Sequence, residues 1–202
     1  QNCYSTGGVI GSLLVGGVCG KNYHGTIQNC YSTGGVSGSY GGGVCGNNND
    51  TITNCYFDSN NYGGGAVGST DGGTITDVEG KTTKAFEKGE VCYLLQSKQE
   101  NGSESGEAPM VWGQTIGTDK APVLTSDSAK TVYPKTTGCV TYSNTESEIT
   151  ENTHSNLGAD FRCTDCGNYE TPVSNNGVYE ISNASQLYWF AECVNKRNTS
   201  AK

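Results

Sequence analysis

The chain repeats one short phrase at a regular interval, and this repetition limits the folds it can adopt. Asn-Cys-Tyr occurs at residues 2–4, 29–31 and 54–56. Two further phrases keep step with it: a glycine-rich phrase at residues 16–20, 42–46 and 64–68, and a Thr-Ile phrase at residues 26–27, 51–52 and 74–75. A period of about 26 residues is typical of solenoids, in which short coils stack on one another. We therefore predict that residues 1–80 form stacked coils and are not organised around a single catalytic centre.

The composition fits such a stack better than a conventional core. Only 33% of the 202 residues are hydrophobic, and 30 are glycine. Each coil needs few inward side chains, because neighbouring coils share them. We expect the glycines where the backbone bends with positive φ or passes close to another coil. The inward ladders expected from the phrases are Ile27, Ile52 and Ile75; Val9 and Val36; and Val18, Val44 and Ala66. The tyrosines at positions 4, 31 and 56 form a column that the pattern allows to be buried or exposed.

The repeat decays near residue 80, where the first domain boundary is expected. Four parts follow from the pattern: a β-solenoid at 1–80, a helical cap and strand pair closing the array at 81–135, a polar linker with a Cys-x-x-Cys pair at 136–172, and a strand–helix lid at 173–202. The lid comprises a strand at 177–181 and a helix at 184–194, capped by Ser182 or Asn183. The predicted fold class is mainly β, a parallel β-solenoid of short glycine-rich coils with a small mixed α/β C-terminal part.

Cysteines recur at fixed phases of the repeat. The chain has ten cysteines, of which Cys3, Cys30 and Cys55 share one phase and Cys19 and Cys45 share another. A cysteine count of this size suggests an oxidising compartment and disulfides. A thiol that recurs once per coil is also a small apolar filler. We favour stacked, reduced cysteines, with disulfides as the alternative.

One cysteine pair near the C-terminus suggests a metal site. Cys163 and Cys166 lie near His154, and together they provide three candidate zinc ligands. A structural zinc site requires four ligands, so we predict no metal site and no cofactor. A local disulfide or a pair of structural thiols is favoured, and metal binding and redox chemistry remain as alternatives.

The charge pattern excludes several classes of function. The net charge is −8, and Lys21 is the only Lys or Arg in residues 1–80. Binding to nucleic acid or anionic membranes needs clustered cations, and the chain has no apolar run long enough to insert into a membrane. The four aspartates of the repeats lie at different phases and are interpreted as solvated turn residues; they are Asp50, Asp58, Asp71 and Asp77. Because no carboxylate pair or catalytic dyad is readable, we predict that the chain is not an enzyme.

The ordered phrases resemble a known repeat. The order Gly-Gly-Val-x-Gly, spacer, Gly-Thr-Ile-x-Asn-Cys-Tyr, then Gly-x-Val is similar to the GLUG motif of bacterial cell-surface adhesins. The resemblance covers residues 1–80 and departs from the motif in Cys19 and Cys45. It implies a right-handed β-solenoid that is secreted or on the cell surface, with an adhesive or structural role and no catalytic residues. A host protein or a glycan is then the expected ligand.

A second hypothesis is self-assembly into a fibre. The chain begins inside a repeat, so we expect it to be a piece of a longer secreted protein with an open first coil. The C-terminal strand and helix resemble a lid without an array to cover, and a lid that docks on the next copy would propagate head to tail. The candidate assembly residues are Asn2, Cys3, Tyr4, Val178, Tyr179, Ile181, Leu187 and Phe190.

Overall fold

The protein divides into two compact units, residues 1–133 and 134–202. The computed structural model describes residues 1–98, 110–137, 139–146, 157–164, 169–170, 172, 174–175 and 178–199. In these residues, no helix is long and apolar enough to cross a membrane.

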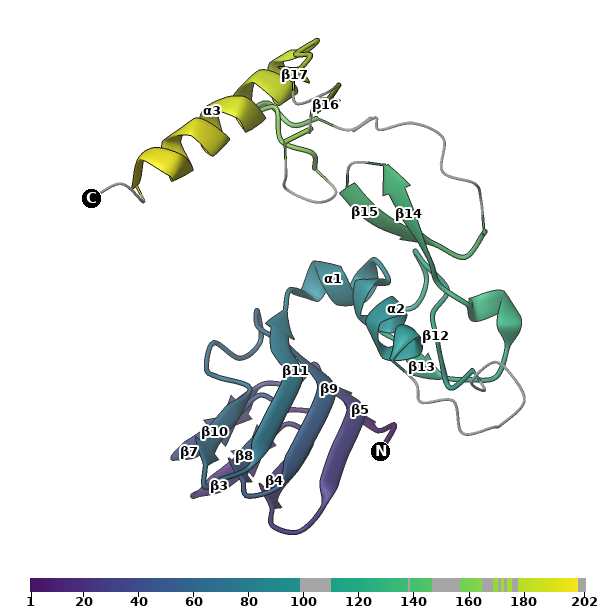
Figure 1. Ribbon diagram of the computed structural model, residues 1–202. Helices are drawn as coiled ribbons and strands as arrows, with labels where there is room; N and C mark the ends of the chain where they lie inside the picture. The colour runs from purple at the N-terminus through teal and green to yellow at the C-terminus, as the bar shows by residue number, and fades with distance from the viewer. Residues whose placement is uncertain are drawn as a thin grey trace. The chain divides into compact units, whose positions relative to one another are not determined.

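The first unit contains a parallel β-solenoid of three stacked coils, as predicted (Figure 1). Its largest sheet has the order β1 (Tyr4–Ser5), β5 (Thr26–Ser32), β9 (Thr51–Asp58) and β11 (Thr74–Lys81). A second parallel sheet has the order β10 (Val67–Thr70), β8 (Cys45–Asn48) and β4 (Cys19–Asn22). Two smaller parallel pairs complete the coils: β2 (Val9–Ile10) with β6 (Val36–Ser37), and β3 (Leu14–Gly16) with β7 (Tyr40–Gly42). The repeated phrases stack in register, so Cys30 lies beside Cys55 and Tyr31 beside Tyr56.

The asparagine of each Asn-Cys-Tyr phrase makes a left-handed bend. Asn2, Asn29 and Asn54 have φ values of 54°, 53° and 49°, and Asp77 continues the series at 53°. Asparagine and aspartate tolerate this conformation better than other side chains do. The Asn54 amide donates to Oδ1 of Asn29 over 2.6 Å, so the bends also form a ladder.

The glycines serve mainly close approach, which corrects half of the prediction made for them. Among the solenoid glycines only Gly72 has positive φ. A Cβ on Gly42 would instead lie 2.0 Å from the carbonyl oxygen of Cys45 and 2.7 Å from the amide nitrogen of Gly68. No side chain fits between backbones this close.

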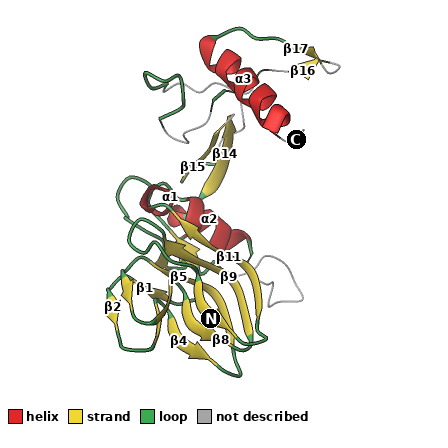
Figure 2. Ribbon diagram, turned by 90° about the vertical axis from the view of Figure 1, so that its left-hand side faces the viewer, coloured by secondary structure: helices red, strands yellow, loops and turns green. Residues whose placement is uncertain are grey.

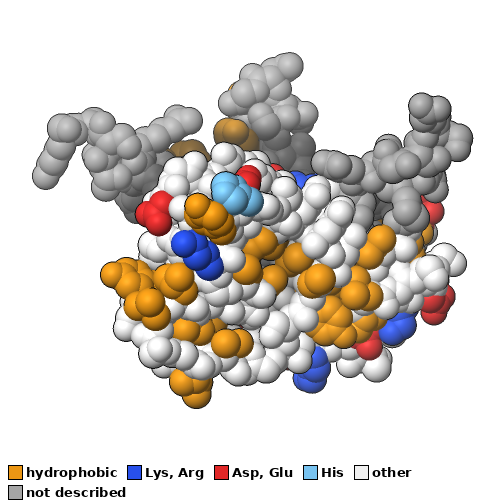
Figure 3. Space-filling model, turned by 90° about the horizontal axis from the view of Figure 1, so that it is seen from below, with side chains coloured by type: hydrophobic (Ala, Val, Ile, Leu, Met, Phe, Trp, Pro, Cys, Tyr) orange, Lys and Arg blue, Asp and Glu red, His pale blue; other side chains and the backbone are white. Residues whose placement is uncertain are grey.

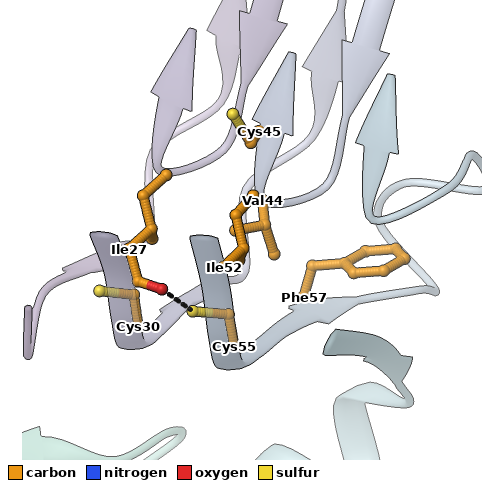
Figure 4. Close-up of a cluster of buried hydrophobic side chains, with 7 residues drawn as sticks. All are labelled: Ile27, Cys30, Val44, Cys45, Ile52, Cys55 and Phe57. Atoms are coloured by element: carbon orange, nitrogen blue, oxygen red, sulfur yellow. Dashed lines mark hydrogen bonds between the residues drawn. The ribbon is translucent and has the colours of Figure 1, made fainter. Parts of the chain in front are cut away.

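The hydrophobic core lies inside the second and third coils (Figure 4). Its buried members are Ile27, Cys30, Val44, Cys45, Ile52, Cys55 and Phe57. The isoleucine ladder is graded: Ile52 is fully buried, whereas Ile75 on the outer strand β11 is 42% exposed. Ile75 was expected to point inward with the others, but β11 pairs only with β9, so only one neighbouring coil covers it.

Residues 83–133 fold against the side of the solenoid. They comprise α1 (Thr83–Glu87), α2 (Glu90–Ser97), β12 (Trp112–Gly113), β13 (Val123–Leu124) and a 3-10 turn at Ser128–Lys130, with β12 and β13 antiparallel. Phe86 and Trp112 pack on Tyr31 with ring centroids 5.5 and 5.6 Å apart, and Trp112 also contacts Tyr4. Both ribbon views show α1 and α2 beside the four-stranded sheet (Figures 1 and 2). The aromatic residues of this segment cover the tyrosine column on successive coils. Closure of the end of the array by residues 81–135 stays a prediction.

The second unit is small and mixed. β14 (Tyr133–Thr137) pairs with β15 (Cys139–Ser143), so part of the region predicted as a polar linker forms strands. β16 (Ser174–Asn175) and β17 (Val178–Tyr179) form an antiparallel pair, and α3 spans Ala184–Thr199. The predicted C-terminal strand and helix are therefore present. Asn183 caps the helix, since its Oδ1 accepts a hydrogen bond from the amide of Gln186 over 3.0 Å.

Candidate functional site

The tyrosine column is largely a packing surface. Tyr31 and Tyr56 are each 1% exposed, and the Tyr31 hydroxyl donates to the carbonyl oxygen of Pro122. Burial raises the pKa of both phenols, because their charged form is poorly solvated there. Tyr4 stacks on Tyr31 with centroids 5.3 Å apart and stays 44% exposed. The repeat left open whether the tyrosine column is buried or exposed. The column is buried in the second and third coils, at Tyr31 and Tyr56.

The thiol column also fills space. The solenoid cysteines at positions 3, 19, 30, 45 and 55 are free thiols, and Cys30 and Cys55 are 1% and 0% exposed. Each of these two thiols donates to a backbone carbonyl of its own coil, Gln28 and Thr53, over 3.1 and 3.2 Å. In Figure 4 the Cys55 thiol also points toward the carbonyl oxygen of Ile27 in the neighbouring coil.

The environment of each buried thiol sets its pKa. The hydrogen bond between the two thiols and burial raise the pKa of Cys55, and the same bond lowers the pKa of Cys30. Burial raises the pKa of Cys45 to about 11 and that of Cys92 in α2 to about 12. Cys45 and Cys92 are therefore neutral thiols near pH 7.

The suggested zinc ligands are not assembled in the described structure. Cys163 is 2% exposed and forms a β-bridge with Leu157. Cys166 and His154 lie outside the described residues. In the part of the chain that the structure describes, no three His, Cys, Asp or Glu side chains gather in a way that could hold a metal ion.

The four aspartates do not converge. Asp58 is only 2% exposed, which corrects its interpretation as a solvated residue. Its carboxylate accepts hydrogen bonds from the amide of Asn60 and the hydroxyl of Thr83 over 2.9 and 2.7 Å, and so ties α1 to the third coil. Asp77 forms an ion pair with Lys98. These carboxylates hold the structure together.

A solenoid surface with aromatic, amide and charged side chains lies where β4, β8 and β10 end. We call it the turn-edge surface and define it as residues 21–24, 47–50 and 69–73. Two rows of side chains run across its three coils, Lys21–Asn47–Ser69 and Tyr23–Asn49–Asp71. Unlike the Asn, Cys and Tyr columns, these rows change residue type at every coil. Aligned positions whose residue type differs between coils are a sequence signal of their own, and repeated phrases do not reveal it.

The turn-edge surface carries an exposed aromatic ring beside charged and amide groups. Tyr23 is 59% exposed, the Lys21 ammonium lies 4.8 Å from its ring centroid, and the His24 ring lies at 4.2 Å. Across the coil boundary, the Asn47 amide donates to Asp71 Oδ2 over 3.0 Å and to Ser69 Oγ over 2.8 Å. In Figure 3 the pale blue imidazole adjoins a hydrophobic side chain in orange, and a basic side chain in blue lies close by.

The predicted assembly residues are mostly at the surface. Cys3 is exposed and Asn2 is half-buried; the exposed fractions of the others are Tyr4 44%, Val178 69%, Tyr179 46%, Ile181 39%, Leu187 55% and Phe190 44%. Within the second unit, α3 buries its polar side: Ser185 and Gln186 are 0% and 5% exposed. The Ser185 hydroxyl donates to the Phe161 carbonyl and accepts from the Glu170 amide, both over 2.8 Å.

Comparison with known proteins gives one match. Residues 11–37, which span the end of the first coil and the start of the second, match the family described as the GLUG motif. This supports the resemblance drawn from the repeated phrases, at the level of the motif. No match was found among the curated proteins or among the solved structures.

Proposed function

We propose that the chain is a non-enzymatic, extracellular β-solenoid module that serves adhesion or acts as a structural spacer on a bacterial surface. The observation that carries the proposal is the burial of the repeated side chains. Asn54, Cys55 and Tyr56 are each at most 1% exposed, so the repeat builds the stack. On the turn-edge surface, the side chains vary from coil to coil. A scaffold of identical coils that presents a variable surface suits adhesion.

The match of residues 11–37 to the GLUG motif is a second support. The adhesive role is what the resemblance of the repeated phrases to bacterial surface adhesins implies. The net charge of −8 favours a partner other than nucleic acid or an anionic membrane. We therefore expect a host protein or a glycan as the partner.

Binding of the purified full chain to printed arrays of host extracellular proteins and glycans tests this function. We expect saturable binding to a small set of ligands that persists at about 0.5 M salt, since an uncharged contact is little screened. A chain denatured by heat is the control. Absence of saturable binding would remove the adhesive role and leave the spacer role.

Self-assembly is a second candidate, and the exposed side of α3 favours it. Leu187, Phe190 and Val194 are 55%, 44% and 42% exposed, although helices usually turn such residues inward. On this proposal they dock on the β1 edge of the first coil of another copy, and the contact repeats head to tail. Light scattering and electron microscopy of the full chain at rising concentration test it: filaments would support it, and a monodisperse monomer at high concentration would exclude it.

A further inference from the structure

The turn-edge surface combines the side chains from which binding sites for sugars are built. We propose that it binds a neutral glycan, with the Tyr23 ring as the stacking platform and with Asn49 and Asp71 as hydrogen-bonding partners of the sugar hydroxyls. The proposal rests on the proposed adhesive function and names the class of its ligand and the place where it binds.

The register of the coils places these three side chains in one row. The Asn49 amide donates to the carbonyl oxygen of Asn22 over 2.8 Å, and the Asp71 amide donates to that of Asn48 over 2.9 Å. Tyr23, Asn49 and Asp71 are therefore neighbours across coils, separated by about 4.8 Å per coil. The row offers one aromatic, one amide and one carboxylate side chain over a length comparable to two sugar rings.

The polar end of the row is preorganised. The Asn47 amide holds one carboxylate oxygen of Asp71, while the exposed Asp71 side chain presents its other oxygen. Asn47 is only 5% exposed, and its Oδ1 and the Oδ1 of Asn49 have no hydrogen-bond partner among the described residues. An acceptor without a donor costs free energy below the surface. The acceptor that a sugar hydroxyl can reach is the second carboxylate oxygen of the exposed Asp71.

The aromatic end suits a sugar ring. Tyrosine offers an apolar ring with a polar tip, which matches a ligand that has C–H groups on its face and hydroxyls on its rim. The Lys21 ammonium lies over the Tyr23 ring, 4.8 Å from its centroid, so a sugar that stacks on this ring takes the opposite face or displaces the ammonium.

The charges of the surface point to a neutral ligand. Lys21 is its only ammonium group, and Asp50 and Asp71 are its two carboxylates. Sialylated or sulfated sugars would meet more negative than positive charge there, which lowers their affinity.

A printed array of neutral, sialylated and sulfated oligosaccharides, probed with the full chain, tests the proposal. We expect binding to neutral glycans, an affinity loss of about tenfold or more in Tyr23→Ala, and a loss of similar direction in Asp71→Ala. Tyr40→Ala is the matched control, because Tyr40 is a comparably exposed tyrosine (49%) on another strand of the solenoid. Its affinity should stay within about twofold of the parent. The melting temperature of each variant shows whether it is folded.

Three outcomes would overturn the proposal. Neutral-glycan binding that survives both turn-edge substitutions, or falls equally in Tyr40→Ala, would place the ligand elsewhere and leave the adhesive function intact. A preference for anionic glycans would contradict the charge argument. Binding to proteins but to no glycan would refute the inference while supporting adhesion, and binding to neither would remove both.

Discussion

The solenoid and the C-terminal unit treat their apolar side chains in opposite ways. In the solenoid, β9 lies between β5 and β11, and its residues Ile52, Cys55 and Tyr56 are at most 1% exposed. In α3, Ser185 is fully buried while Leu187 is 55% exposed. A coil receives its packing partners from the next repeat of the same phrase. A single amphipathic helix has no such repeat, so its burial depends on whatever segment folds against it.

The largest expected loss of stability comes from substitution of a glycine that lies between two coils. In Gly42→Ala the new methyl group meets the backbone of Cys45 and Gly68 at 2.0 and 2.7 Å, and neither atom belongs to a side chain that can rotate away. We expect the free energy of unfolding to fall by about 3 kcal/mol or more, measured by urea denaturation. Gly63→Ala is the control, because a Cβ there has nothing within 4 Å. Equal stability of the two variants would contradict the close-approach argument.

Truncation of isoleucines at the same repeat position tests whether their burial decreases toward the outer strand. Ile52→Ala leaves a cavity between two coils and should cost about 2–3 kcal/mol, whereas Ile75→Ala on the outer strand should cost about 1 kcal/mol or less. The two residues have the same type and phase and differ mainly in exposure, 0% against 42%. If urea unfolding gave similar losses for both, the exposed side of Ile75 on β11 would be covered in solution.

Alkaline pH should weaken the first unit. Burial raises the pKa of Cys45 to about 11 and of Cys92 to about 12, and it raises the pKa of Tyr31 and Tyr56. A group whose pKa is higher in the folded state stabilises the fold at pH values below its unfolded pKa. This contribution is lost as the pH rises through its folded pKa. The urea midpoint should therefore fall between about pH 9 and 11, where these buried groups deprotonate in the unfolded chain.

Substitution of both thiols sharpens this test. In the Cys45→Ala, Cys92→Ala double variant, the fall of the urea midpoint with pH should be shallower, because two of the buried groups that deprotonate at alkaline pH are removed. A midpoint in the parent chain that did not change up to pH 11 would show that these groups are solvated.

The smallest effects on stability are expected in α3. Here the loss of a polar side chain should cost more than the loss of an apolar one, because the polar side chain is the buried one. Ser185→Ala removes two hydrogen bonds of a buried hydroxyl and should cost about 1 kcal/mol. Leu187→Ala should change stability by about 0.5 kcal/mol or less, because the side chain is exposed. Thermal unfolding followed by circular dichroism distinguishes the two. A larger loss for Leu187→Ala would mean that its face is covered in solution, as self-assembly requires.

The repeat in the sequence was sufficient to predict the solenoid and its register. The in-register neighbours Ile27 and Ile52, the buried thiols Cys30 and Cys55, and the helix after Asn183 all follow from spacing and residue type. Spacing predicts phase well because parallel coils must align identical residues. It predicted the left-handed bends less well: the pattern assigned them to glycine, whereas asparagine makes most of them.

The local sequence pattern indicates neither the packing of residues 83–133 on the tyrosine column nor the turn-edge surface. Trp112 and Tyr31 are far apart in the chain, and no local pattern indicates that their rings pack together. The row of Tyr23, Asn49 and Asp71 shares a repeat position without sharing a residue type, so a search for repeated phrases does not detect it.

The sequence alone determined that the chain stacks, which residues align from coil to coil, and that cysteine serves mainly as filler. Only the tertiary structure decided that residues 83–133 bury the tyrosine column, that Ile75 stays exposed, and that α3 turns its polar side inward. Alignment within a solenoid follows from the local repeat and from parallel hydrogen bonding. Burial depends on which distant segments pack over a surface, and that depends on the whole chain.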